Sequence, residues 1–121
     1  METLRKVKVL RIYLSSTDKF KHTSLYEAIV FAAKRGGLMG ATVLKGVMGY
    51  GASNKIHIQK FWEISEKTPL VVEIIDSEEK IDLFVEKISP WFEKIKTGVL
   101  LTVTEANVLI EKKGSPKKLP L

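Results

Sequence analysis

The sequence predicts an α+β fold of the ferredoxin-like class, βαββαβ, in which an antiparallel sheet carries two helices on one face. The first observation behind this prediction is hydrophobic periodicity, which gives strand, helix, strand, strand, helix, strand along a chain of 121 residues. The second is that valine and leucine occupy both faces of several expected strands. We therefore expect the sheet face without helices to be buried by other subunits of an oligomer.

The first strand and the first helix are predicted near the amino terminus. Residues 7–14 are rich in β-branched side chains. One face of this strand is apolar: Leu10, Ile12 and Leu14. Ser24 and Glu27 have the spacing of a capping box, in which each side chain accepts a hydrogen bond from an otherwise unpaired amide, so a helix should begin there. Gly36 and Gly37 should end it, because glycine adopts left-handed conformations without strain.

A second strand and a long loop follow. We expect the strand at residues 41–48, where Gly46 indicates a bulge or a close backbone approach. Residues 51–68 show no single periodicity, and a loop of that length is uncommon in a small domain unless it has a function. The loop is not wholly polar, and some of its side chains need cover from a helix, a neighbouring subunit or a partner: Ile56, Ile58, Phe61, Trp62 and Ile64.

The second half of the chain gives two more strands and a helix. A third strand is predicted at residues 70–75, and the helix after it should be capped by Asp76 or Ser77. Pro90 should break or kink this helix, because proline has no backbone N–H. The last strand is expected at residues 99–104, in the centre of the sheet. It lacks the exposed aromatic residues by which RRM domains of this fold bind RNA, so no nucleic-acid partner is predicted.

The composition excludes several classes of protein. Without cysteine there is no disulfide framework, no thiolate zinc site and no cysteine nucleophile. No apolar run approaches the roughly 20 residues of a membrane span, and the amino terminus lacks a secretory signal, so we expect a cytoplasmic protein without membrane insertion. The net charge of +6 lies mostly at the two ends of the chain. We therefore expect one domain at residues 1–111 and a solvated, basic flexible tail at residues 112–121.

Two histidines are candidates for chemistry. His22 lies before the first helix and His57 lies in the long loop, and their spacing does not place two ligands on one helical face. No metal site and no catalytic residue are therefore predicted. The alternative function is a small enzyme for phosphoryl transfer or hydrolysis that uses one of these histidines, although the sequence shows no partner that would orient either ring.

Glycines are concentrated in one part of the chain. Six of the eight lie within residues 36–51. At the end of the second strand, residues 49–53 (Gly-Tyr-Gly-Ala-Ser) offer backbone amides that can form a concavity for an anion, and Lys45 and Lys55 flank them. The spacing matches neither a P-loop nor the Rossmann fingerprint. A glycine-rich strand end without a ligand is the alternative, and the protein would then be a purely structural oligomer.

The same region resembles a known family. Residues 37–43 read G-L-M-G-A-T-V, and together with Lys45 and residues 49–51 (G-Y-G) they resemble the PII signalling proteins. In those proteins a helix ends in G-[ILV]-x-G-x-T-V and the next strand ends in G-F-G before a long mobile loop. The chain is closer still to PII-like relatives of uncharacterised role, because it has their pattern L-Y-E-A-I at residues 25–29 and G-A-T-V-L-[RK]-G…G-[FY]-G-A-S at residues 40–53.

The resemblance implies a homotrimer of ferredoxin-like subunits that binds an adenine nucleotide (ADP, AMP or ATP) in clefts between subunits. The long loop would change conformation on binding and dock onto a target such as a transporter or an enzyme, so the protein would be a signalling regulator and not itself an enzyme. The nucleotide would lie at these residues: Thr42, Gly49, Tyr50, Gly51, Ala52, Ser53, Thr97 and Gly98. Four features depart from PII proteins: Ala52 stands where they have an arginine, the second phosphate loop is shortened to residues 94–98, the paired arginines after the last strand are missing, and the spacing from Gly40 to Gly49 is one residue longer.

Overall fold

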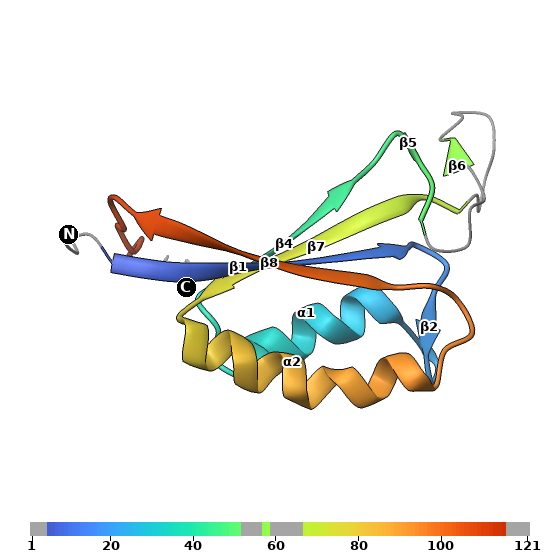
Figure 1. The fold of residues 1–121 in the computed structure, drawn as a ribbon, viewed down its shortest axis with the longest axis horizontal. Coiled ribbons are helices and arrows are strands. Elements are labelled where there is room, and N and C mark those ends of the chain that lie inside the picture. Colours follow the sequence, from blue (N-terminus) through green and yellow to red (C-terminus); the bar gives the residue numbers. More distant parts are fainter. Residues whose placement is uncertain (1–4, 52–56, 59–66, 116–121) are drawn as a thin grey trace, which may run out of the picture.

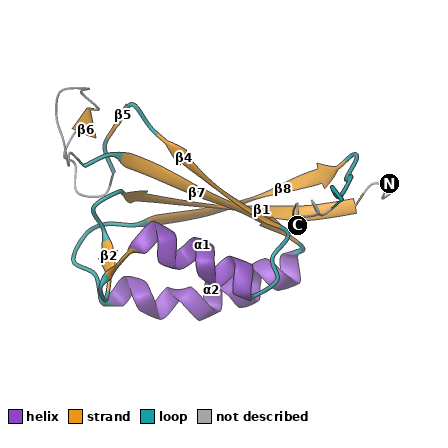
Figure 2. Cartoon of the chain, turned by 180° about the vertical axis from the view of Figure 1, so that it is seen from behind, coloured by secondary structure: helices purple, strands orange, loops and turns teal. Residues whose placement is uncertain are grey.

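The computed structural model describes residues 5–51, 57–58 and 67–115. A four-stranded antiparallel sheet in the order β4-β7-β1-β8 carries two helices on one face (Figure 1). Six elements form these two layers: β1 (Arg5–Ser15), α1 (Leu25–Arg35), β4 (Gly40–Lys45), β7 (Pro69–Asp76), α2 (Glu78–Glu93) and β8 (Leu100–Val108). Four short strands pair outside the main sheet: β2 (Lys19–Phe20) with β3 (Thr23–Ser24), and β5 (Met48–Gly49) with β6 (His57–Ile58) (Figure 2). The predicted ferredoxin-like α+β fold is confirmed.

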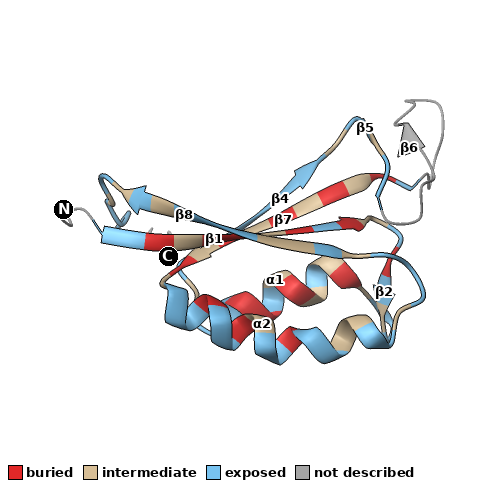
Figure 3. Cartoon of the chain, viewed as in Figure 1, coloured by how far each residue is buried: buried red, intermediate tan, exposed pale blue. Residues whose placement is uncertain are grey.

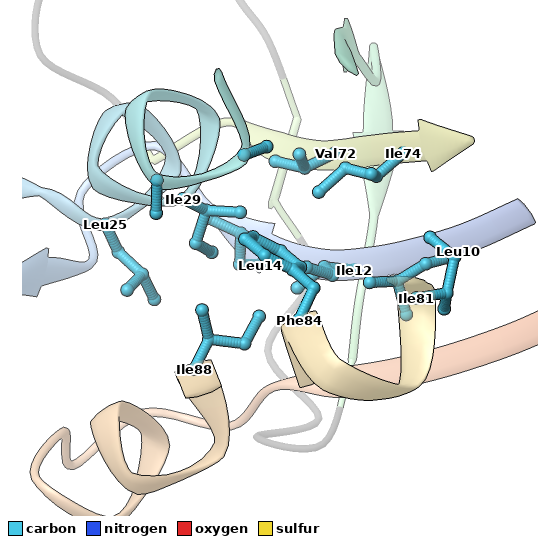
Figure 4. Close-up of a cluster of buried hydrophobic side chains, with 12 residues drawn as sticks. Leu10, Ile12, Leu14, Leu25, Ile29, Val72, Ile74, Ile81, Phe84 and Ile88 are labelled. Atoms are coloured by element: carbon cyan, nitrogen blue, oxygen red, sulfur yellow. The ribbon is translucent and has the colours of Figure 1, made fainter. Parts of the chain in front are cut away.

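The core lies between the helices and the sheet face that they cover (Figure 3). Leu10, Ile12 and Leu14 share one face of β1 as predicted, because alternate residues of a strand lie on opposite faces, and this face points toward the helices. They pack with apolar side chains of α1, β7 and α2, which are shown in Figure 4: Leu25, Ile29, Val72, Ile74, Ile81, Phe84 and Ile88. Burial of these side chains is the main force that holds the two layers together, so the strand ends keep fixed positions.

Strand β8 lies at an edge of the sheet, and the prediction that residues 99–104 form a central strand is wrong. The two central strands are β1 and β7, because β1 pairs with β7 and β8, and β7 pairs with β1 and β4. Strand β8 also continues beyond its predicted end to Val108, which is in register with Arg5 at the start of β1. The long pairing with β1 therefore sets the length of β8.

Helix α1 begins after Ser24 as expected, but its capping box is absent. The side chain of Ser24 makes no cap hydrogen bond. Ser24 pairs in β3, and the amide of Leu25 donates instead to the carbonyl oxygen of Asp18 at 2.8 Å. At the other end of α1, Gly37 has a φ of +72°, the left-handed conformation that the glycine pair predicted. The hydrogen bond from Leu25 to Asp18 thus replaces the side-chain cap that was predicted at Ser24.

Helix α2 begins as predicted but does not end at its proline. The hydroxyl of Ser77 accepts a hydrogen bond from the amide of Lys80 at 3.3 Å. Pro90 lies inside the helix, which continues for another turn. Trp91 in that turn stacks on Phe20, with ring centroids 4.5 Å apart, and both rings pack against the core. This packing offsets the hydrogen bond that the proline removes.

Strand β4 ends earlier than predicted, because the chain approaches β7 closely at Gly46. The amide of Gly46 donates to the carbonyl oxygen of Pro69 at 2.7 Å, which confirms the predicted close approach. Beside it, the amide of Ser16 donates to the carbonyl oxygen of Thr68, and the amide of Thr68 donates to Ser16 Oγ, both at 2.9 Å. We call Ser16, Gly46, Thr68 and Pro69 the neck. The neck joins the two ends of the segment between β4 and β7.

Replacement of Gly46 by alanine should lower the free energy of unfolding by about 1 kcal/mol. A Cβ atom at this position would lie 3.1 Å from Pro69 Cγ and 3.3 Å from the Pro69 carbonyl oxygen, so the neck would have to widen. Urea denaturation measures the change. Gly40→Ala is the matched control at the other end of β4, because a Cβ atom there meets nothing within 4 Å. Equal effects of the two substitutions would show that the close approach at the neck does not contribute to the free energy of unfolding.

Candidate functional site

The glycine-rich strand end projects beyond the main sheet, in β5 and the residues that follow it (Figure 1). Residues 49–51 are at least partly exposed. A Cβ atom at Gly51 would meet no other atom within 4 Å, so the described part of the chain leaves this backbone uncovered. An anion site needs such open backbone amides. The rest of the predicted stretch, Ala52 and Ser53, lies outside the described residues, as does most of the loop at residues 51–68.

The base of this strand end is held against β7. A Cβ atom at Gly49 would lie 3.6 Å from Pro69 Cβ, which is ordinary van der Waals contact. Strand β5 also pairs with β6, with Gly49 opposite His57. Gly46 of the neck lies two residues before β5, and its hydrogen bond to Pro69 ties this part of the chain to the start of β7. The backbone of residues 49–51 is therefore uncovered, while the start of this segment is held in place by its contacts with β7.

Thr42 lies within β4 on the sheet face opposite the helices, which we call the open face. Thr42 is in register with Glu73 on β7, and Glu73 is in register with Arg11 on β1. Glu73 Oε2 accepts a hydrogen bond from Arg11 Nε at 3.1 Å, and Arg11 Nη1 donates to Thr104 Oγ1 at 3.2 Å. The hydroxyl of Thr42 thus borders a row of polar groups, which can hydrogen bond to a ribose or a base.

Thr97 and Gly98 lie in the loop that leads from α2 into β8. Thr97 Oγ1 donates to Asp18 Oδ1 at 2.8 Å, and Asp18 Oδ2 accepts from the amide of Ser15 at 2.9 Å. Because the hydroxyl proton of Thr97 is used on Asp18, Thr97 and Gly98 have only their backbone amides left to donate to a phosphate. Asp18 is only 4% exposed and ties the loop to the end of β1. Asp18 was not among the predicted site residues, and the one signal for it in the sequence was an aspartate in a turn after a strand.

The predicted site residues lie along two edges of the sheet. Thr42 and residues 49–51 lie at the β4 edge, whereas Thr97 and Gly98 precede the β8 edge. Strands β7 and β1 lie between these edges. Neighbouring strands are about 4.8 Å apart, so roughly 14 Å of sheet separates β4 from β8. Within the described residues, a ligand at either edge therefore contacts only one of the two sets of predicted site residues.

The open face also carries an apolar row. The strand registers place four apolar residues side by side across the whole sheet: Leu44, Val71, Tyr13 and Leu100. Leu44 is 49% exposed, Tyr13 is 41% exposed and Leu100 is 57% exposed. A continuous apolar row on the surface of a subunit marks an interaction surface. This row supports the prediction that other subunits bury the open face.

The two histidines show no catalytic arrangement in the described part of the chain. His22 is exposed in the turn between β2 and β3, and no described side chain hydrogen bonds to it. His57 lies in β6, and its side chain is outside the described residues. Within residues 5–51 and 67–115, no three His, Asp or Glu side chains gather in a way that would hold a metal ion. Neither of the two described helices is long and apolar enough to cross a membrane.

Comparison with known sequences gives one family. Residues 7–108 match the model of the DUF190 family, described as an uncharacterised ACR. A UPF0166 protein of Aquifex aeolicus is 38% identical over 104 residues, which is 86% of this chain and 94% of that protein. The match extends from β1 to β8 and so includes every main element of the fold.

Among the solved structures that share this architecture are two PII-like proteins. One is CPII, a nitrogen regulatory PII-like protein from Thiomonas intermedia K12 bound to ADP, AMP and bicarbonate, with a TM-score of 0.64 and 19% identity over 88% of this chain and 91% of that chain. The other is a putative PII-like signaling protein from Thermus thermophilus, with a TM-score of 0.64 and 20% identity over 89% of this chain and 94% of that chain. These likenesses confirm the fold that the PII resemblance implied.

Proposed function

Since the chain belongs to the DUF190 family and has the fold of PII-like proteins, we propose that it is a non-enzymatic signalling regulator that binds an adenine nucleotide between the subunits of a homotrimer. The observation that carries this proposal is the uncovered backbone at the end of β5, where a Cβ atom at Gly51 would meet nothing within 4 Å. CPII, which shares the fold, was bound to ADP and AMP, and this supports the class of ligand.

The phosphate would be bound by backbone amides of residues 49–53, because N–H groups at a strand end attract an anion and glycine leaves room for it. Thr42 would provide a hydroxyl for the ribose or the base, and the backbone amides of Thr97 and Gly98 would contact the phosphate from another side. Ala52 stands where PII proteins have an arginine, so one cation fewer faces the phosphates. We therefore expect AMP or ADP to bind more tightly than ATP.

The trimer would close through the open face. The apolar row there, from Leu44 to Leu100 across the sheet, would then be removed from water, which is the main driving force for association. The same association places the edge of one sheet beside a neighbouring subunit. The open backbone at β5 would thereby gain a second wall, in addition to the one that the described residues of a single chain provide.

The nucleotide would act by shifting the population of loop conformations. A ligand that binds one arrangement of residues 51–68 more tightly than another raises the population of that arrangement by its differential affinity. A target protein, such as a transporter or an enzyme, that recognises this arrangement then binds differently, and the coupling between target and nucleotide is reciprocal. The neck favours such a mechanism, because it fixes both ends of the segment and isolates the core from changes between them.

Calorimetric titration with AMP, ADP, ATP and cyclic AMP tests this proposal. We expect saturable binding of AMP or ADP and no product on prolonged incubation. At a ligand concentration of ~100 times Kd, binding adds about 2.7 kcal/mol to the free energy of unfolding, so the melting temperature should rise. The alternative, a purely structural oligomer, predicts that no nucleotide binds and that none raises the melting temperature. Product formation that is lost in His22→Ala or His57→Ala would establish the enzymatic alternative.

A further inference from the structure

A hollow of about 310 Å³ lies on the helix side of β4. Its lining consists of Ser16, Tyr26, Val43, Lys45, Thr68 and Leu70. Val43 and Lys45 are in register with residues of β7 that face the helices, whereas Thr42 is in register with Glu73 on the open face. The sheet therefore separates this hollow from the hydroxyl proposed to contact the nucleotide.

The walls of the hollow are mainly apolar. Val43 and Leu70 come from the sheet, and Tyr26 comes from the first turn of α1. Leu70 is buried and Tyr26 packs against the core, so these walls are held in place. Lys45 is the one charged residue among the described lining residues, and it forms no ion pair within the described part of the chain. An apolar hollow with one cation at its rim favours a ligand that has an apolar body and a single negative charge.

Two lining residues also belong to the neck. Ser16 and Thr68 line the hollow, and their two hydrogen bonds of 2.9 Å link the end of β1 to the start of β7. Lys45 is the residue before Gly46, whose amide donates to Pro69. A ligand in the hollow would therefore contact the groups that hold both ends of the segment between β4 and β7.

We propose that this hollow binds a small organic carboxylate, with its apolar part against Val43 and Leu70 and its carboxylate beside Lys45. The volume lies at the lower end of the range for ligand cavities, roughly 300–1,000 Å³, so a ligand of about ten non-hydrogen atoms or fewer fits. The carboxylate would be a second effector that acts on the neck. The effect of the carboxylate on a target protein rests on the proposed function, whereas the binding of the carboxylate in the hollow does not.

Benzoate and its neutral analogue benzyl alcohol are suitable probes for the full chain. NMR titration of the methyl resonances of Val43 and Leu70 measures binding directly at the walls of the hollow. We expect saturable shifts with both probes, and a benzoate affinity about three to five times that of benzyl alcohol. The preference is modest because water screens the ammonium group of an exposed lysine.

Three variants separate the charge from the cavity. Lys45→Met keeps the aliphatic stem and removes the charge, so the two probes should bind equally. Val43→Trp should fill the hollow and abolish the binding of both probes. Lys87→Met is the matched control, because Lys87 lies on α2 and does not line the hollow. It should retain the preference of the wild type.

Two results would overturn the proposal. The first is the lack of saturable shifts at Val43 and Leu70. The second is an undiminished preference for benzoate in Lys45→Met.

Calorimetry with AMP and ADP on Val43→Trp tests whether the two sites are separate. Retained nucleotide binding with lost benzoate binding supports separate sites, and loss of both contradicts them. If the wild type binds benzoate but no nucleotide, the proposed function fails and the carboxylate site stands.

Discussion

Replacement of Gly51 by valine is expected to weaken AMP and ADP binding at least about 100-fold while the oligomer stays intact. A Cβ atom at this position meets nothing within 4 Å, so the described fold accommodates valine without rearrangement. The new side chain would then occupy the space in front of the backbone amides. A 100-fold loss corresponds to about 2.7 kcal/mol, which is the scale of one or two hydrogen bonds to a charged group. Calorimetry measures the affinity, and sedimentation measures the assembly.

The matched control for this substitution is Gly114→Val. A Cβ atom at Gly114 would also meet nothing within 4 Å, but this residue lies near the carboxyl end of the described residues, after β8. Nucleotide affinity should be unchanged in this variant. Wild-type affinity in Gly51→Val would remove the end of β5 from the binding site.

Replacement of Val71 by lysine is expected to convert the assembly into monomers at micromolar concentration. Val71 lies on the open face, in register with Leu44 on one side and Tyr13 on the other. Its side chain faces away from the core, so the isolated subunit should keep its fold. In the closed assembly the ammonium group would be buried without a partner, which costs several kcal/mol. Sedimentation equilibrium measures the change in mass.

Phe31→Lys provides the control for the charge itself. Phe31 is an exposed apolar residue of α1, on the layer opposite the open face (Figure 1). This variant should assemble as the wild type does. An intact trimer in Val71→Lys would mean that the open face is not the contact between subunits, and the second wall of the nucleotide site would have to come from elsewhere.

A strand of this fold could be predicted where its own pattern of apolar and polar residues is sufficient. Leu10, Ile12 and Leu14 alternate along β1, and their burial follows from that alternation alone. The position of a strand in the sheet is not local information. Residues 99–104 are apolar enough for a central strand, yet β8 pairs with β1 alone and lies at an edge. Only the pairing of distant segments decides that order.

Helix ends show the same limit. Ser24 and Glu27 have the spacing of a capping box, but the amide of Leu25 bonds to Asp18, which precedes the β2–β3 hairpin. Pro90 has the chemistry of a helix breaker, but stacking in the following turn keeps the helix intact. In both places a tertiary contact outweighs the local preference that the residue type expresses.

The candidate site was predictable in part. The density of glycines located the uncovered backbone at the end of β5, because glycine leaves backbone amides accessible. The link between Thr97 and Asp18 could not be predicted, since it joins side chains 79 residues apart in the sequence. The row of polar groups beside Thr42 likewise exists only through the registers of three strand pairs.

The central claim is that backbone amides at the end of β5 bind the phosphate of an adenine nucleotide. The most direct measurement is a comparison of AMP with adenosine, by amide NMR of the full chain at saturating ligand. The account predicts that AMP moves the amide resonances of Gly49 and Gly51 and that adenosine, which has no phosphate, leaves them in place. Saturable AMP binding that shifts other resonances and leaves these two unmoved would contradict it.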